Sequence, residues 1–74
     1  MSLQECTQAL QTVGQIRING GEFSAAELEA AAAAAREAHA RLFVYNLKGL
    51  SCAEIGRIAE AGGRQVYFDD IRLI

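Results

Sequence analysis

The side chains best suited to nucleophilic chemistry in this chain are two cysteines and one histidine. They are Cys6, Cys52 and His39. A catalytic thiol needs a base within hydrogen-bond reach. Cys52 falls in the first turn of an expected helix, where a thiolate is favoured, but His39 falls near the far end of the preceding expected helix. We therefore expect no enzymatic activity, no metal site and no cofactor, and we interpret both cysteines as reduced thiols.

A second group of polar residues follows the expected strands and would suit a ligand. Asn19, Asn46 and Asp69 each come directly after a short apolar stretch. The carboxyl ends of parallel strands meet at one edge of a sheet, and open α/β sheets bind ligands beyond that edge. The candidate site for a small polar or anionic ligand comprises Asn19, Gly20, Gly21, Asn46, Lys48 and Asp69. The alternative interpretation is that these residues only make the turns after the strands.

Serine and glutamate three residues apart predict where helices begin. The stretches "EFSAAEL" (22–28) and "GLSCAEI" (49–55) share the order apolar, Ser, Glu, apolar. This order is typical of a capping box with a hydrophobic staple, in which the Ser and Glu side chains bind each other's backbone N–H groups. Ser2 and Glu5 repeat the spacing, and Leu3, Cys6, Leu10 and Val13 then form an apolar stripe. We therefore predict helices over residues 3–13, 25–40 and 52–61.

Short runs of β-branched and aromatic residues predict three strands. Residues 15–19 alternate apolar with polar, residues 41–47 are apolar on both faces, and residues 64–69 form the third run. Strands that alternate with helices call for a parallel sheet with right-handed crossovers. We predict one α/β domain over residues 1–74, in the order α-β-α-β-α-β. Its three-stranded, mainly parallel sheet has helices chiefly on one face; strand order 1-2-3 is favoured, with 2-1-3 as the alternative.

The chain also contains a β-α repeat. Residues 16–28 overlay residues 43–55 without a gap, which aligns Ile16 with Phe43 and Ile18 with Tyr45 as matching positions of the repeat, and a partial third copy begins at Val66. A period in this range is typical of solenoids. The strand-ending Asn and the strand–helix alternation resemble the longer leucine-rich repeats, although the Leu-x-x-Leu-x-Leu pattern of that family is not met. The resemblance implies a solenoid-like stack that binds proteins on its sheet face.

Charge and composition exclude several classes of partner. The formal net charge is -2, with acidic and basic residues interspersed, so we expect no nucleic-acid binding. Residues 50–63 resemble the first helix of a helix-turn-helix, but a strand-like run follows where the recognition helix would lie. The alanine run at 30–35 is too short to span a membrane, and the start lacks a signal-peptide pattern. We expect no membrane association and a cytoplasmic location.

Helices on one face of the sheet would leave its other face open. The outer strands would then direct Arg17 and Tyr67 outward. The central strand would add one of two sets: Leu42 and Val44, or Phe43, Tyr45 and Leu47. Monomers seldom leave such an apolar patch uncovered, so we assign interface residues at Arg17, Val44 and Tyr67 and predict a homodimer. The predicted function is a small, self-associating protein-interaction module; the alternative is a ligand binder at the strand ends.

Overall fold

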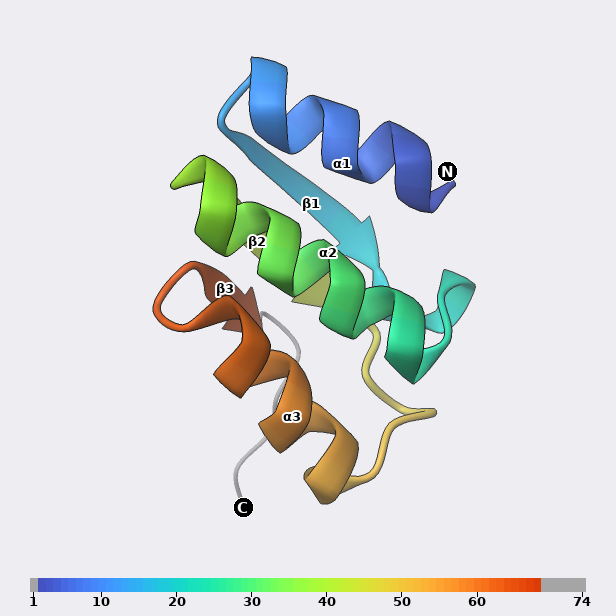
Figure 1. Ribbon diagram of the computed structural model, residues 1–74. Helices are drawn as coiled ribbons and strands as arrows, with labels where there is room; N and C mark the ends of the chain where they lie inside the picture. The colour runs from blue at the N-terminus through green and yellow to red at the C-terminus, as the bar shows by residue number, and fades with distance from the viewer. Residues whose placement is uncertain (1, 69–74) are drawn as a thin grey trace.

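The computed structural model describes residues 2–68 and has the predicted α/β order (Figure 1). Its elements are α1 (Leu3–Thr12), β1 (Gln15–Asn19), the 3-10 turn η1 (Gly20–Glu22), α2 (Ala25–Ala38), β2 (Arg41–Tyr45), α3 (Cys52–Gly62) and β3 (Val66–Phe68). The strands form one parallel sheet in the order β1-β2-β3. The helices lie side by side over one face of this sheet (Figure 1). The predicted fold class and the favoured strand order are therefore confirmed.

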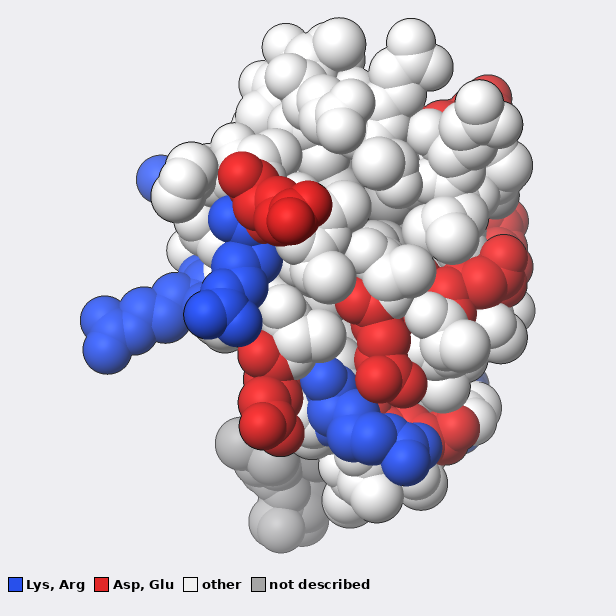
Figure 2. All heavy atoms as spheres, in the orientation of Figure 1, with Lys and Arg blue, Asp and Glu red and all other residues white. Residues whose placement is uncertain are grey.

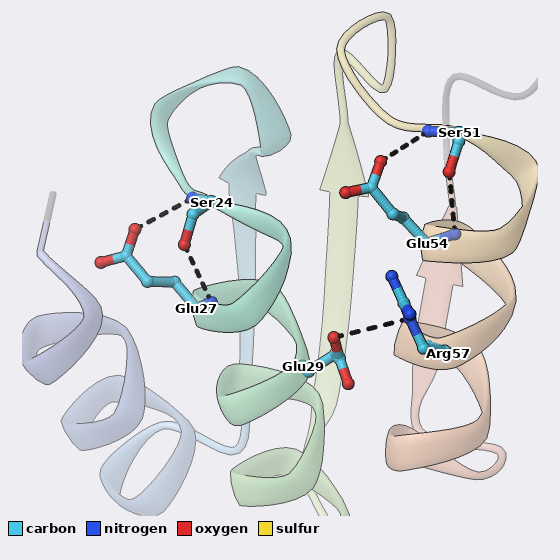
Figure 3. Close-up of polar contacts among 6 residues, drawn as sticks. All are labelled: Ser24, Glu27, Glu29, Ser51, Glu54 and Arg57. Atoms are coloured by element: carbon cyan, nitrogen blue, oxygen red, sulfur yellow. Dashed lines mark hydrogen bonds and ion pairs between the residues drawn. The ribbon is translucent and has the colours of Figure 1, made fainter.

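All three helices begin at the predicted capping boxes. The hydroxyl oxygens of Ser24 and Ser51 accept from the backbone N–H of Glu27 and Glu54, each at 3.2 Å. The glutamate carboxylates accept in return from the serine N–H groups, each at 2.9 Å (Figure 3). Ser2 and Glu5 make the same pair of bonds at the start of α1. Each box satisfies two N–H groups that a helix start would otherwise leave unbonded.

The core lies between the helix layer and the inner face of the sheet. Its largest fully buried side chains are Leu10, Leu28, Leu42, Ile58, Val44 and Cys6. Small residues bring the helices close together: a Cβ on Gly62 would collide with the side chain of Val66 and lie 3.2 Å from the Cβ of Ala32. Val13 was predicted to complete the apolar stripe of α1, but it is 71% exposed. It lies past the last turn of α1, where Gly14 (φ 90°) redirects the chain into β1.

The strand register corrects the predicted overlay by one residue. Across the sheet, Ile16 pairs with Leu42 and Ile18 pairs with Val44, whereas the sequence overlay aligns them with Phe43 and Tyr45, one residue further along the chain. In the first copy, Asn19 is the last residue of β1. In the second copy, Asn46 comes one residue after the end of β2, and it accommodates the extra residue by adopting a left-handed conformation (φ 59°). Asn tolerates that region better than most residues. The two copies therefore match again from the asparagines to the capping boxes.

Candidate functional site

The asparagines at the strand ends bond to each other and to the chain itself. Asn19 Oδ1 accepts from Asn46 Nδ2 at 2.8 Å and from the backbone N–H of Gly21 at 2.9 Å. The structure thus brings together the predicted residues Asn19, Gly21 and Asn46. Two intramolecular donors already share this oxygen, which favours the interpretation of these residues as a turn that ties neighbouring repeats together.

The other predicted strand-end residues are Gly20, Lys48 and Asp69. Gly20 is buried, and a Cβ there would lie 3.0 to 3.1 Å from the carbonyl oxygens of Tyr45 and Asn46. Its role is therefore the close packing of η1 on the chain after β2. Lys48 is exposed in the loop before α3, and Asp69 lies outside the described residues.

The cysteines and the histidine occupy three separate environments. Cys6 is fully buried, and burial raises the pKa of its thiol, so it remains protonated as part of the core. His39 is the left-handed C-cap of α2, and it lines a surface hollow with Gly62 and Gly63 at the end of α3. Cys52 is the first residue of α3. About ten helical residues, or about 15 Å, therefore separate Cys52 from His39, and the two do not form a nucleophile–base pair.

The face of the sheet opposite the helices carries three aromatic side chains of the described strands. Alternation along each strand directs Phe43 and Tyr45 of β2 and Tyr67 of β3 to this face, which we call the aromatic surface. Phe43 and Tyr67 are cross-strand neighbours, and their rings stack with centroids 5.0 Å apart and planes 20° apart. Tyr67 is 42% exposed, and Phe43 and Tyr45 are partly exposed. Stacked pairs of this kind stabilise a sheet surface beyond the area they bury.

Two arginines flank the aromatic surface. The Cζ atom of Arg17 lies 4.9 Å from the ring centroid of Tyr45, a cation–π distance. Arg17 is also the register partner of Phe43, so Arg17, Phe43 and Tyr67 form one row across the three strands. Arg41 shares the outward alternation of Phe43 in β2 and is exposed. The structure therefore places the predicted interface residues Arg17 and Tyr67 on the open face.

The third predicted interface residue, Val44, does not lie on the open face. It is fully buried and packs with Leu42 under the helices, because β2 directs its two aliphatic residues inward. Phe43 and Tyr45 hold the outward positions, and Leu47, which lies after the end of β2, is buried as part of the core. The sequence contains a signal for this choice: Arg41 has the same alternation as Phe43 and Tyr45, and a charged residue favours the solvent side of a strand.

The charges of the two faces differ. Neither Asp nor Glu occurs in β1, β2 or β3, whereas each of the three helices carries at least one glutamate. Seen from the helix side, acidic side chains (red) lie mostly across the middle and lower parts of the view, with basic side chains (blue) between them (Figure 2). Among them, Glu29 of α2 and Arg57 of α3 form an exposed ion pair at 3.9 Å (Figure 3). The open face of the described sheet is thus aromatic and basic, and the helix face is mixed with many carboxylates.

Neither a metal-binding cluster nor a membrane-spanning helix occurs within residues 2–68. These residues contain no cluster of three or more His, Cys, Asp or Glu side chains placed to hold a metal ion. None of their helices is long and apolar enough to cross a membrane. Comparisons with protein-family models, with curated proteins and with solved structures found no match to this chain.

Proposed function

We propose that this chain is a protein-interaction module that binds its partner on the open face of the sheet. The observation that carries the proposal is the aromatic surface of Phe43, Tyr45 and Tyr67 on a parallel sheet whose described helices all lie on its other face. Parallel sheets usually have both faces covered. Aromatic residues and arginine are also the types most enriched at protein interfaces and at their energetic hot spots.

The charge of this face indicates the chemistry of the partner. Arg17 and Arg41 are the charged residues of the described strands, and both are on the open face. A complementary partner presents a carboxylate to the exposed guanidinium group of Arg41 and apolar side chains to the aromatic surface. We therefore propose that the occupant is an acidic segment of another protein that also carries large apolar residues.

A second copy of the chain fits this face less well. A two-fold dimer uses the same surface of both copies, so it would bring together two faces that each carry the exposed Arg41. The described strands contribute no Asp or Glu to this face. Like charges that face each other across an interface disfavour the complex.

Selection from a random peptide library tests the proposal directly. The immobilised chain is the bait. Peptides that also bind a Phe43→Ser, Arg41→Glu double variant are discarded as non-specific. We expect the enriched peptides to be net acidic, with aromatic or large aliphatic residues. In calorimetric titrations of the best peptide, Tyr67→Ser should weaken binding at least about tenfold, as expected for loss of a central aromatic contact.

The control variant is Gln8→Ser, an exposed residue of α1 on the helix side. It should leave the affinity unchanged, and circular dichroism verifies that every variant is folded. Two outcomes would refute the proposal: no enrichment over the bare support, or peptides that bind the wild type and the Phe43→Ser, Arg41→Glu variant equally well.

A further inference from the structure

We propose that the partner segment bound on the open face is an amphipathic α-helix of about three turns, which lies along β2 and places a carboxylate over Arg41. This inference rests on the proposed function and names the conformation and the residue pattern of the partner. Three features of the face carry it: the direction of the strand hydrogen bonds, the dimensions of the sheet, and the order of the side chains along β2.

The backbone hydrogen bonds of the described strands run within the sheet and not toward its open face. β2 is paired with β1 on one side and with β3 on the other. Of the aromatic side chains, Phe43 has no hydrogen-bonding atom, and Tyr45 and Tyr67 have one hydroxyl each. An extended segment laid on these rings would lose water from its N–H and C=O groups without gaining partners for most of them, which is costly. A helix bonds these groups internally and avoids that cost.

The dimensions of the sheet fit one helix. Adjacent strands lie about 4.8 Å apart, so β1 and β3 are about 10 Å apart, which is close to the diameter of a helix with its side chains. Along β2, Arg41 and Tyr45 are about 13 Å apart, a distance that a helix spans in about nine residues. The other face of the same sheet already holds a helix: α2 lies over β2 (Figure 1), and its buried residues include Leu28, Ala32 and Ala35.

The side chains along β2 specify the order of residues in the partner helix. Arg41 is exposed at the start of β2, Phe43 follows two residues later in its stack with Tyr67, and Tyr45 follows after two more. Two strand residues advance by about 6.6 Å, and four helical residues advance by about 6 Å. The partner therefore has Asp or Glu at position i and large apolar residues at i+4, i+7 and i+8, or the same order in the reverse direction.

Arg41 determines the position of the helix along β2. A guanidinium group can form two parallel hydrogen bonds with one carboxylate. The described strands contain no Asp or Glu that would compete for it. Charge complementarity therefore favours the carboxylate of the partner at this end of β2 and its apolar residues over the aromatic surface.

Designed peptides of equal composition test the pattern against the full chain. Each has about 15 residues of alanine and glutamine, with one glutamate and three leucines. The helical peptides place glutamate at i and leucines at i+4, i+7 and i+8, in either chain direction, whereas the control peptide alternates the same residues with alanine, as in a strand. In calorimetric titrations, the better helical peptide should bind at least about tenfold more tightly than the control peptide.

Glycine substitutions in the helical peptide test its bound conformation. On the side away from the leucines, each replacement of alanine by glycine removes no contact but lowers helix propensity, so it should weaken binding about fivefold. The circular dichroism of the peptide should become more helical in the complex. An extended peptide would show neither effect.

Charge exchange tests the position of the helix. Arg41→Glu should weaken binding of the helical peptide at least about tenfold, and a peptide with lysine in place of the glutamate should restore it. The control variant Gln8→Ser, on the helix side, should bind like the wild type. Circular dichroism of the free variants verifies that both are folded.

Several results would overturn the inference: equal binding of the helical and control peptides, no effect of the glycine substitutions, or no preference of the Arg41→Glu variant for lysine. A failure of the proposed function is distinguishable from these results. The random-library selection would then yield no peptide that depends on Phe43 and Arg41. Selected peptides that depend on both residues but lack the helical pattern would overturn the helix alone.

Discussion

The two sides of β2 are both apolar but perform different tasks. Leu42 and Val44 are fully buried under the helices, whereas Phe43 and Tyr45 are partly exposed on the other face. Aliphatic residues thus hold the fold together, and aromatic residues next to arginines form the surface that we propose for binding. The difference shows that the hydrophobicity of a strand does not by itself decide which side is the core; the covering layer and the neighbouring charges do.

The largest expected contrast is between a core and a surface substitution in β2. Leu42→Ala removes a fully buried side chain and should lower the free energy of unfolding by about 3 kcal/mol. Phe43→Ala, one residue away, should lower it by about 1 kcal/mol or less, because it removes mainly the stack on Tyr67. Urea unfolding measures both. Equal losses would mean that the open face is also core.

A pair of glycines in α3 gives the next largest contrast. Gly62→Ala should destabilise the fold by about 1 to 3 kcal/mol, because the new methyl group collides with Val66 and crowds Ala32. Gly56→Ala has open space and should stabilise the isolated fold by up to about 1 kcal/mol through helix propensity. Thermal melts of the two variants test this, and a stable Gly62→Ala variant would contradict the close packing of α3 on β3.

The capping boxes should contribute to the stability of the fold and not to the affinity for the peptide. Ser24→Ala and Ser51→Ala should each lower the free energy of unfolding by about 1 kcal/mol, because each leaves an N–H group at a helix start without its side-chain partner. Gln8→Ala is the exposed control. Neither serine variant should change peptide affinity once the protein is folded. Unchanged denaturation midpoints for both would refute the assigned role of the boxes.

The smallest expected effect is the pH dependence of the same helix starts. The hydrogen bonds from Ser51 lower the pKa of Glu54 below its usual 4.5, and those from Ser2 act similarly on Glu5. A lowered pKa in the folded state means that the contribution to stability is complete above about pH 4.5 and is lost as the pH falls through the folded value. Glu54→Gln should therefore reduce the loss of stability in acid, whereas Tyr67→Ala should not. Identical acid profiles for wild type and Glu54→Gln would contradict this role.

The sequence was sufficient for the features that depend on local rules. Ser24 and Glu27 determine a helix start by their spacing alone, and the alternation of helices and strands determines a parallel sheet. The one-residue difference between the copies was missed because Asn46 adopts a left-handed conformation that no spacing rule specifies. Val44 was assigned to the wrong face because both sides of β2 are apolar, so its side depends on packing against distant helices. The bond between Asn19 and Asn46 likewise depends on the register of residues 27 positions apart.

The most direct test of the central claim is an amide chemical-shift map of the chain with the best acidic peptide from the selection. We predict that the largest changes fall on the strands, in the row of Arg17, Phe43 and Tyr67 and at Tyr45, and that the amides of α1 and α2 remain nearly unchanged. Changes concentrated at Gly20, Gly21 and Asn46 would instead favour the strand-end site. Changes concentrated on the helices would contradict the proposal that the open face of the sheet is the binding surface.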